Sequence, residues 1–250
     1  NMQIDKISQK KLFFDEGYFV CKKLVDENFI KKILDEIGTS KDTVKYFDNE
    51  NNLRRIEKLF DKGVSLKDLN DKILIILKNI FEEEFVIFKD KFNAKPPGGE
   101  GFFAHFDGVF NFNNVNGMQK NGWYEYGNFF INVLIALDEC NEHNGTIELS
   151  KIHNGNFHDL LSKTKNDGTP ALNKKTEDMI LFNPINLEAG DIVIFSNKCP
   201  HRSKKNNSNK SRRVLYYTYT PLVNGSKYNQ YFIDKEKSKN PSKALVDKKE

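Results

Sequence analysis

The chain has 250 residues, enough to bury one sizeable hydrophobic core, and all-β chains of this length commonly form one domain. Charged residues make up 30% of the chain but the formal net charge is only +4, so the overall charge does not indicate a nucleic-acid partner. Three scattered cysteines (Cys21, Cys140 and Cys199), no apolar leader and no membrane-length apolar run together predict a soluble, cytoplasmic protein without a disulfide framework.

The first part of the chain, about residues 1–84, carries helical patterns. Apolar side chains recur at helical spacing from Phe29 to Ile37, just before Gly38, and again from Leu66 to Ile80. Stripes of this kind usually face a hydrophobic core. We therefore expect helices that wrap around the rest of the domain.

From Phe85 onward the pattern changes to β. The nearly continuous apolar run from Phe129 to Leu137 is typical of a central strand that is covered on both faces. Strands are predicted near residues 85–95, 102–107, 128–138, 146–150, 190–196 and 212–220. These suffice for a double-stranded β-helix, the jelly roll of cupin-like proteins.

The predicted organisation is a single domain over residues 1–250, mostly β with flanking helices. It has a helical part at about 1–84, a jelly-roll core at about 85–222 and a frayed tail at about 234–250, where charged residues dominate. Two polar insertions, 108–127 and 154–186, interrupt the strands. The first is rich in aromatic residues, which indicates either a lid over a site or simple packing under a long loop.

A possible metal site is the most specific feature of the chain. In the extended segment His105-Phe106-Asp107, the first and third side chains share one face because strand side chains alternate. His201 follows another predicted strand. Two histidines and one carboxylate form the facial triad that binds non-heme Fe(II) and leaves coordination positions open. A His-x-Asp pair alone occurs by chance in many chains, so the prediction depends on the neighbouring motifs.

The ordered set of motifs resembles the phytanoyl-CoA dioxygenase family of Fe(II)- and 2-oxoglutarate-dependent oxygenases. In that family His-x-Asp is followed by an Asn-Gly turn, by Gly-Asp leading into His-x-Ser, and by Arg eleven residues after the second His. The chain supplies His105 and Asp107, Asn144-Gly145, Gly190-Asp191, His201-Arg202-Ser203 and Arg212. The resemblance runs from about residue 14 to 232. Residues 88–99 and 200–203 look like a subgroup described as 2-aminoethylphosphonate dioxygenase-like.

The resemblance implies roles for the triad. His105, Asp107 and His201 would bind Fe(II), and 2-oxoglutarate and O2 would be the cosubstrates, with succinate and CO2 released. Related halogenases carry a small residue in place of the carboxylate. The intact Asp107 therefore implies a hydroxylase.

Arg212 stands at the family position for the arginine that binds the distal carboxylate of 2-oxoglutarate. Its planar guanidinium can donate two parallel hydrogen bonds to a carboxylate. Arg213 is the rival, but neighbouring strand residues face opposite sides, so only one of the two can point into the barrel. Asn132 and Ser203 are further candidates for cosubstrate binding. Alternatively, a polar side chain on a buried strand such as Asn132 satisfies only neighbouring backbone groups.

The charge pattern gives the sign of the expected substrate. No acidic residue occurs between Asp191 and Asp234, a segment with eight Lys and Arg residues. A positive field at the site would attract a small anionic or zwitterionic molecule, with an aminophosphonate as the first candidate.

Two alternatives stay open from the sequence. One is a non-catalytic cupin-like protein that binds a metal or small molecule. The other is a nucleic-acid demethylase, which would need a basic groove with stacking aromatics. We expect a small-molecule partner, and neither nucleic acid nor membrane. The sequence does not indicate an oligomeric state.

Overall fold

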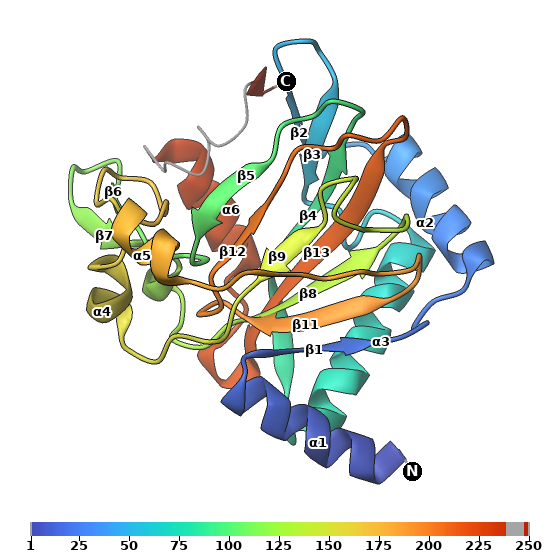
Figure 1. Cartoon of the computed structure of the whole chain (residues 1–250), viewed down its shortest axis with the longest axis horizontal. Helices are drawn as coiled ribbons and strands as arrows, with labels where there is room; N and C mark the ends of the chain where they lie inside the picture. Colours follow the sequence, from blue (N-terminus) through green and yellow to red (C-terminus); the bar gives the residue numbers. More distant parts are fainter. Residues whose placement is uncertain (1, 239–247, 250) are drawn as a thin grey trace.

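The computed structural model describes residues 2–238 and 248–249, and its centre is a pair of antiparallel sheets (Figure 1). In spatial order, the large sheet consists of β1 (Tyr18–Cys21), β11 (Ile192–Ser196), β8 (Ile131–Ala136), β13 (Arg212–Pro221), β4 (Phe85–Lys95), β3 (Leu53–Glu57), β2 (Val44–Phe47) and β14 (Lys248–Lys249). The small sheet consists of β10 (Asn183–Pro184), β9 (Ile147–Leu149), β12 (His201–Ser203) and β5 (Phe102–His105). The two sheets form the predicted double-stranded β-helix.

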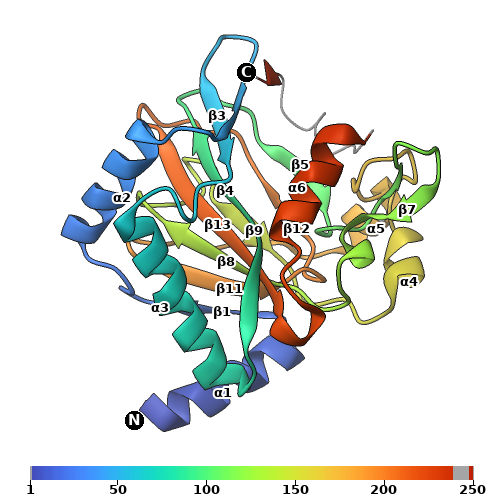
Figure 2. The same cartoon turned by 180° about the vertical axis from the view of Figure 1, so that it is seen from behind.

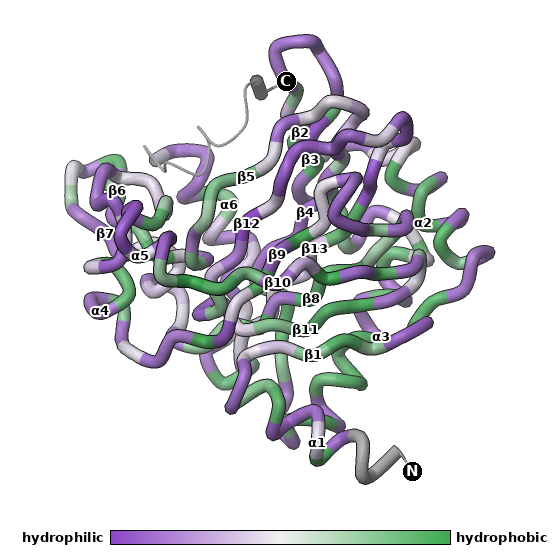
Figure 3. The backbone as a smooth tube through the Cα atoms, in the orientation of Figure 1, coloured by the Kyte–Doolittle hydropathy of each residue, from purple (hydrophilic) through white to green (hydrophobic). Residues whose placement is uncertain are grey.

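Side-chain alternation on the central strand β8 assigns its two faces. Val133 and Ile135 belong to the core between the large sheet and the helices, whereas Leu134 and Ala136 belong to the core between the two sheets. Figure 3 shows that β8 and β11 are hydrophobic while the loop between β2 and β3 is hydrophilic. Asn132 has the same parity as Leu134, so a polar side chain faces the space between the sheets.

Helices cover the outer face of the large sheet (Figure 2). They are α1 (Met2–Asp15), α2 (Glu27–Thr39), α3 (Val64–Phe81) and, towards the end of the chain, α6 (Tyr228–Lys237). Asp26 caps α2 by accepting a hydrogen bond of 2.8 Å from the Phe29 amide. The predicted stripe on α3 is buried from Leu66 to Ile80. Within residues 2–238, no helix has the length and apolar character needed to cross a membrane.

Two sequence predictions require correction. The segment 1–84 contains the expected helices, but it also contributes β1, β2 and β3 to the large sheet. These strands have only four or five residues and little apolar alternation, so periodicity could not reveal them. The predicted frayed tail, about 234–250, is helical as far as Lys237, and residues 239–247 and 250 lie outside the described part of the chain.

The two insertions lie beside each other at one end of the sheets (Figure 1). The first contains a small hairpin, β6 (Asn111–Asn113) and β7 (Gln119–Asn121), followed by the 3-10 turn η1 (Gly122–Glu125). The second contains α4 (Phe157–Leu161) and α5 (Lys174–Met179), and a further turn, η2 (Leu222–Asn224), follows β13. The first insertion places Phe110 and Trp123 in the wall of the cavity described below.

A buried ion pair attaches α6 to β3. The Lys235 ammonium lies 2.6 and 2.8 Å from the two Glu57 carboxylate oxygens, and both residues are almost fully buried. Although burial opposes ionisation, Lys235 and then Arg55 outweigh it and lower the pKa of Glu57 to about 2.

We expect Glu57→Gln to destabilise the protein by roughly 3 kcal/mol, because the substitution leaves the buried Lys235 ammonium unpaired. A carboxylate with a depressed pKa contributes stability above its ordinary pKa of 4.5 and loses it as the pH falls towards 2. Urea unfolding at several pH values should therefore show a difference between wild type and variant that shrinks over this range. An equal difference at pH 3 and pH 7 would contradict the assignment.

Candidate metal centre and active site

Adjacent strands of the small sheet bring the two predicted histidine ligands together. His105 on β5 pairs in register with His201 on β12, and their ring centroids are 4.3 Å apart. Asp107 follows β5, and its Oδ1 lies 3.2 Å from His105 Nε2 and 3.5 Å from His201 Nε2. One potential ligand atom from each residue lies within 4.8 Å of the others. The three residues predicted from the sequence therefore converge on one point.

Hydrogen bonds to the backbone orient both imidazoles. His105 Nδ1 lies 2.9 Å from the Phe103 carbonyl, and His201 Nδ1 lies 3.0 Å from the Cys199 carbonyl. A carbonyl oxygen only accepts, so each Nδ1 carries a proton, and the Nε2 that faces Asp107 is the atom that would bind a metal. This is the arrangement that a metal-binding histidine requires.

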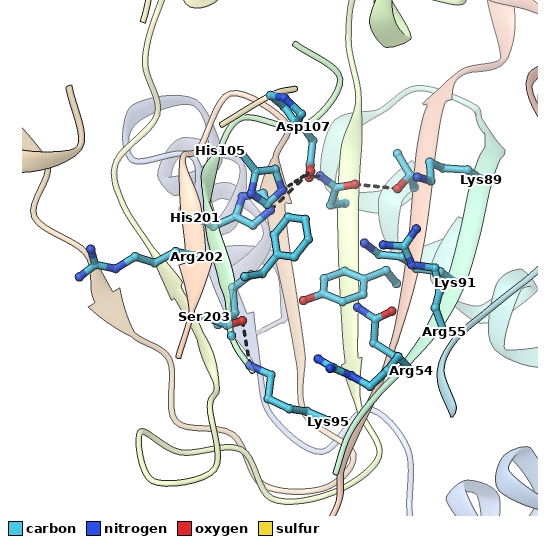
Figure 4. Close-up of a pocket in the computed structure, with 18 of the residues that line it drawn as sticks. Arg54, Arg55, Lys89, Lys91, Lys95, His105, Asp107, His201, Arg202 and Ser203 are labelled. Atoms are coloured by element: carbon cyan, nitrogen blue, oxygen red, sulfur yellow. Dashed lines mark hydrogen bonds and ion pairs between the residues drawn. The ribbon is translucent and has the colours of Figure 1, made fainter. Parts of the chain in front are cut away.

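Two consecutive hydrogen bonds from residues of the large sheet fix the orientation of the Asp107 carboxylate. Asn132 Nδ2 donates to Asp107 Oδ2 at 2.7 Å, and Thr218 Oγ1 donates to Asn132 Oδ1 at 2.7 Å (Figure 4). Asn132 and Thr218 face each other across β8 and β13. Asp107 Oδ2 is thus held by protein while Oδ1 faces the histidines, so Asn132 contacts the carboxylate of the triad and not only backbone groups.

The site favours an ionised carboxylate beside a neutral imidazole. Burial opposes ionisation of Asp107, but His201 and His105 outweigh it and hold its pKa well below the usual range. Burial, assisted by His201, lowers the pKa of His105 below its ordinary 6.5. A carboxylate and a neutral imidazole are the forms that bind divalent metals.

The triad opens onto a cavity of about 230 Å³ between the two sheets. Its wall includes the predicted Asn132, Ser203 and Arg212 together with aromatic residues from the first insertion. Cavities for drug-sized ligands typically measure about 300–1,000 Å³, so this one suits small molecules.

The structure separates Arg212 from its rival. Arg212 is buried, lines the cavity and has no hydrogen-bond partner for its Nε among the described residues. Arg213 faces the other way, with Nε and Nη2 donating to the Asp138 carboxylate at 2.8 and 2.9 Å. The two arginines therefore face opposite sides, as strand alternation predicts, and Arg212, which the family spacing favoured, is the one that lines the cavity.

Ser203 reaches the cavity but is bound to a lysine. Lys95 Nζ donates to Ser203 Oγ at 2.8 Å and to the carbonyls of Gly145 and Lys204 at 3.0 and 2.6 Å. Lys95 is buried, and burial, with help from Arg212 and Arg54, lowers its pKa to about 6. It joins β4 to the loops after β8 and β12.

The source of positive charge differs from the sequence prediction. Four cations of the acid-free segment are paired with acids from elsewhere: Arg202 with Glu148 and Glu177, Lys204 with Glu148, Lys205 with Glu100, and Arg213 with Asp138. The cavity is positive mainly because β3 and β4 contribute Arg54, Arg55, Lys89, Lys91 and Lys95 to its wall.

Lys89 and Lys91 on β4 are site residues that sequence reasoning missed. Lys89, Lys91, Asn93 and Lys95 occupy alternate positions, and all four line the cavity. Their opposite neighbours Phe88 and Phe92 pack in the core beneath the helices. The alternation is visible in the sequence FKDKFNAK. The sequence does not show which face of β4 points into the barrel, so it could not identify these lysines as site residues.

Comparison with known proteins agrees with this geometry. The Phytanoyl-CoA dioxygenase (PhyH) family profile matches residues 13–214, most of the chain. A 2-aminoethylphosphonate dioxygenase from an uncultured bacterium, HF130_AEPn_1, is 27% identical and aligns with 97% of this chain and 92% of its own length. A methylphosphonate hydroxylase from Gimesia maris is 30% identical over 62% of this chain and 53% of its own length. A probable alpha-ketoglutarate-dependent hypophosphite dioxygenase from Stutzerimonas stutzeri is 25% identical over 89% of this chain and 83% of its own length.

Solved structures share the fold at low sequence identity. The non-heme alpha ketoglutarate dependent epimerase SnoN from nogalamycin biosynthesis superposes with a TM-score of 0.66 at 13% identity, covering 88% of this chain and 84% of its own. EctD from S. alaskensis gives a TM-score of 0.64 at 15% identity, covering 87% and 77%. The family match, the fold and the converging triad together lead to one conclusion: the chain belongs to the phytanoyl-CoA dioxygenase family of Fe(II)- and 2-oxoglutarate-dependent oxygenases, and it is a dioxygenase.

Proposed function

We propose that the protein hydroxylates a small anionic or zwitterionic molecule, with a phosphonate as the first candidate, and releases succinate and CO2. The observation that carries this proposal is the shared cavity. Among the described residues, its wall combines the His105, Asp107 and His201 triad with seven Lys and Arg side chains and one carboxylate besides Asp107. Three of the seven, Arg54, Arg55 and Arg202, are paired with acids outside the wall, and the other four have no ion pair within the described part of the chain. Such an excess of positive charge fits a dianionic cosubstrate together with an anionic substrate.

The donor set fits Fe(II). Two imidazole Nε2 atoms and one carboxylate oxygen already face one another, and the opposite atom of each ligand is held by a hydrogen bond. In this proposal His105, Asp107 and His201 bind the metal, while the rest of its coordination sphere stays open to the cavity. When bound, iron and 2-oxoglutarate supply the oxidising chemistry that replaces a C–H bond with C–OH.

The other residues position and protect the reactants. Arg212 is assigned to the distal carboxylate of 2-oxoglutarate because its guanidinium faces the cavity with an unused donor. Asn132 and Thr218 keep Asp107 in its orientation. Ser203 is a further candidate contact for the cosubstrate, on the side of the cavity where Lys95 holds it. Phe110 and Trp123 wall off the cavity beside the triad and restrict the access of water.

The names of the similar proteins support the phosphonate as first candidate. Two of the three relatives described above are named for phosphonates and the third for hypophosphite, which is also a phosphorus oxyanion. The cavity volume favours a molecule of this size over a long-chain substrate. Amino acids and other small carboxylates are the second candidates.

A substrate panel tests the proposal. Succinate and hydroxylated product should be measured together for 2-aminoethylphosphonate, methylphosphonate, small carboxylates, and neutral and cationic compounds of similar size. We expect coupled turnover with phosphonates, or with another small anion, above the substrate-independent rate. Coupled turnover confined to neutral lipophilic compounds would contradict the proposed substrate class.

Of the two alternatives that the sequence left open, one is set aside and the other is still to be tested. A non-catalytic cupin-like binder is set aside by membership in a dioxygenase family. The absence of a nucleic-acid partner stays a prediction. Salt-sensitive binding of single-stranded DNA would contradict it.

A further inference from the structure

A second group of cations lies across the cavity from the triad. Arg55 on β3 and Lys89 and Lys91 on β4 point into the cavity from the large sheet, opposite His105 and His201 (Figure 4). This group, Arg55, Lys89 and Lys91, is called the β3–β4 cation cluster. It does not include the paired cations described above, such as Arg202, and none of its members has a role in the chemistry assigned so far.

The two lysines have unused hydrogen-bond donors. Neither ammonium group donates a hydrogen bond to, or forms an ion pair with, any residue in the described part of the chain. Lys89 is only 8% exposed, and its Nζ lies 4.9 Å from the Trp123 ring centre. Lys91 Nζ lies 4.8 Å from the ring centre of Tyr216. Ring faces attract a cation but accept none of its N–H groups in full hydrogen bonds, so each ammonium can still bind an anionic acceptor.

The charge of the cluster is only partly balanced by the protein. Glu57 forms an ion pair with Arg55, but both of its oxygens already accept from Lys235, and Asp107 is taken up by the histidines and Asn132. Arg55 Nη1 is 3.5 Å from Glu57, and the buried Arg55 Nε has no partner among the described residues. Burial lowers the pKa of both Lys89 and Lys91, and Arg55 lowers both further. Uncompensated buried cations are costly, which favours a ligand that neutralises them.

Lys89 is far from Arg212 along the strands, whereas the other two members of the cluster lie nearer: Lys91 pairs with Tyr216, and Arg55 pairs with Asn93, the partner of Val214. Arg212 pairs with Lys95, and Thr218 pairs with Lys89, in the β13 and β4 register. Six residues of extended strand separate the two ends by roughly 20 Å between Cα atoms. Thr218, the strand partner of Lys89, is hydrogen-bonded through Asn132 to Asp107, so Lys89 lies at the metal end of the cavity.

We propose that Lys89 and Lys91, with Arg55, bind the oxyanion group of the substrate, and that this group is a tetrahedral phosphonate. The inference rests on the proposed function and adds the residues that select the substrate. A phosphonate offers three oxygens to two ammonium groups and one guanidinium, whereas a carboxylate offers only two. Trp123 and Phe110 would contact the short carbon chain, which then extends from the cluster towards the triad.

Methylphosphonate binding tests the cluster without turnover. It should be titrated calorimetrically into the metal-free full-length protein and into Lys89→Met, Lys91→Met and Lys67→Met. Lys67 is exposed on α3, beyond the opposite face of the same sheet, and so is the matched control. We expect the two cavity variants to bind methylphosphonate ten- to a hundredfold more weakly, as roughly estimated for a lost charge-assisted contact. The control should bind as wild type does.

Two further measurements make the result specific. Affinity for 2-oxoglutarate, titrated with Mn(II) in the absence of oxygen, should be unchanged in both cavity variants because Arg212 is intact. Thermal unfolding should show that the variants are folded, and Lys91→Gln serves as a second variant should Lys91→Met not fold. Lys89→Arg keeps the charge and should restore part of the methylphosphonate affinity.

Several results would overturn the inference. The first is that wild type and both variants bind methylphosphonate with equal affinity, and the second is that wild type does not bind it at all. The third is that the variants lose as much affinity for 2-oxoglutarate as for methylphosphonate. The proposed function is judged separately, by substrate-dependent succinate formation in the wild-type enzyme. If the wild-type enzyme turns over a phosphonate but all variants bind methylphosphonate as tightly as wild type does, the proposed function stands. The β3–β4 cation cluster is then not the phosphonate-binding site.

Discussion

Replacing His105, Asp107 or His201 by alanine is expected to abolish substrate-dependent succinate formation and to remove most bound iron. Within the described part of the chain, these three side chains are the ones placed to bind a metal, so no fourth residue there compensates for a lost ligand. The fold should survive, because the cores around β5 and β12 are made by other residues. Iron content, succinate release and thermal unfolding are the measurements, with the exposed His143→Ala as the control.

Asp107→Ala differs from the histidine variants in one respect. It also leaves the buried Asn132 amide without its acceptor, which typically costs about 1–3 kcal/mol. A modest loss of stability is therefore expected for this variant alone. Near-normal iron content together with near-normal activity in any of the three alanine variants would show that the ligand assignment is wrong.

Arg212→Met should weaken 2-oxoglutarate binding by roughly ten- to a hundredfold, the usual effect of losing a charge-assisted pair. Arg213→Met is the matched control on the neighbouring position. Arg213 binds Asp138 on the opposite face of β13, and the pair is partly exposed. The control should therefore leave 2-oxoglutarate affinity unchanged and cost at most about 1 kcal/mol of stability.

Titration of 2-oxoglutarate into both arginine variants, with a redox-inert divalent metal, separates the two residues. Equal losses in Arg212→Met and Arg213→Met would contradict the argument from strand alternation. Unchanged affinity in Arg212→Met would assign the distal carboxylate to another cation of the cavity.

The Lys91→Met and Arg212→Met variants together test whether the cavity has two separate anion sites. If it does, Lys91→Met should lower the affinity for methylphosphonate and leave that for 2-oxoglutarate unchanged, and Arg212→Met should do the reverse. The structural basis is the register of β4 and β13, which places Lys95 beside Arg212 and Lys91 beside Tyr216. Sites that far apart on rigid strands are expected to contribute independently.

The sequence by itself determined the parts of the site that depend on local geometry. Strand alternation sends Arg212 and Arg213 to opposite faces, whatever the rest of the chain does. The His-x-Asp spacing also brought His105 and Asp107 to one site, although Asp107 lies in the turn after β5 and not in the strand. Long apolar runs and stripes likewise revealed β8 and α3. Short strands such as β1 gave no comparable signal, because their pairing with β11 depends on a partner more than 170 residues away.

Only the tertiary structure decided which charges remain free. Arg202 is neutralised by Glu148 and Glu177, whereas the Lys89 ammonium group lies over the rings of Trp123 and Tyr231 and has no ion pair with a described residue. The partner of a charged side chain is whichever residue the fold places next to it, and sequence distance carries no information about that. The triad could therefore be found from spacing, while the cations that give the cavity its charge could be found only from the packed sheets.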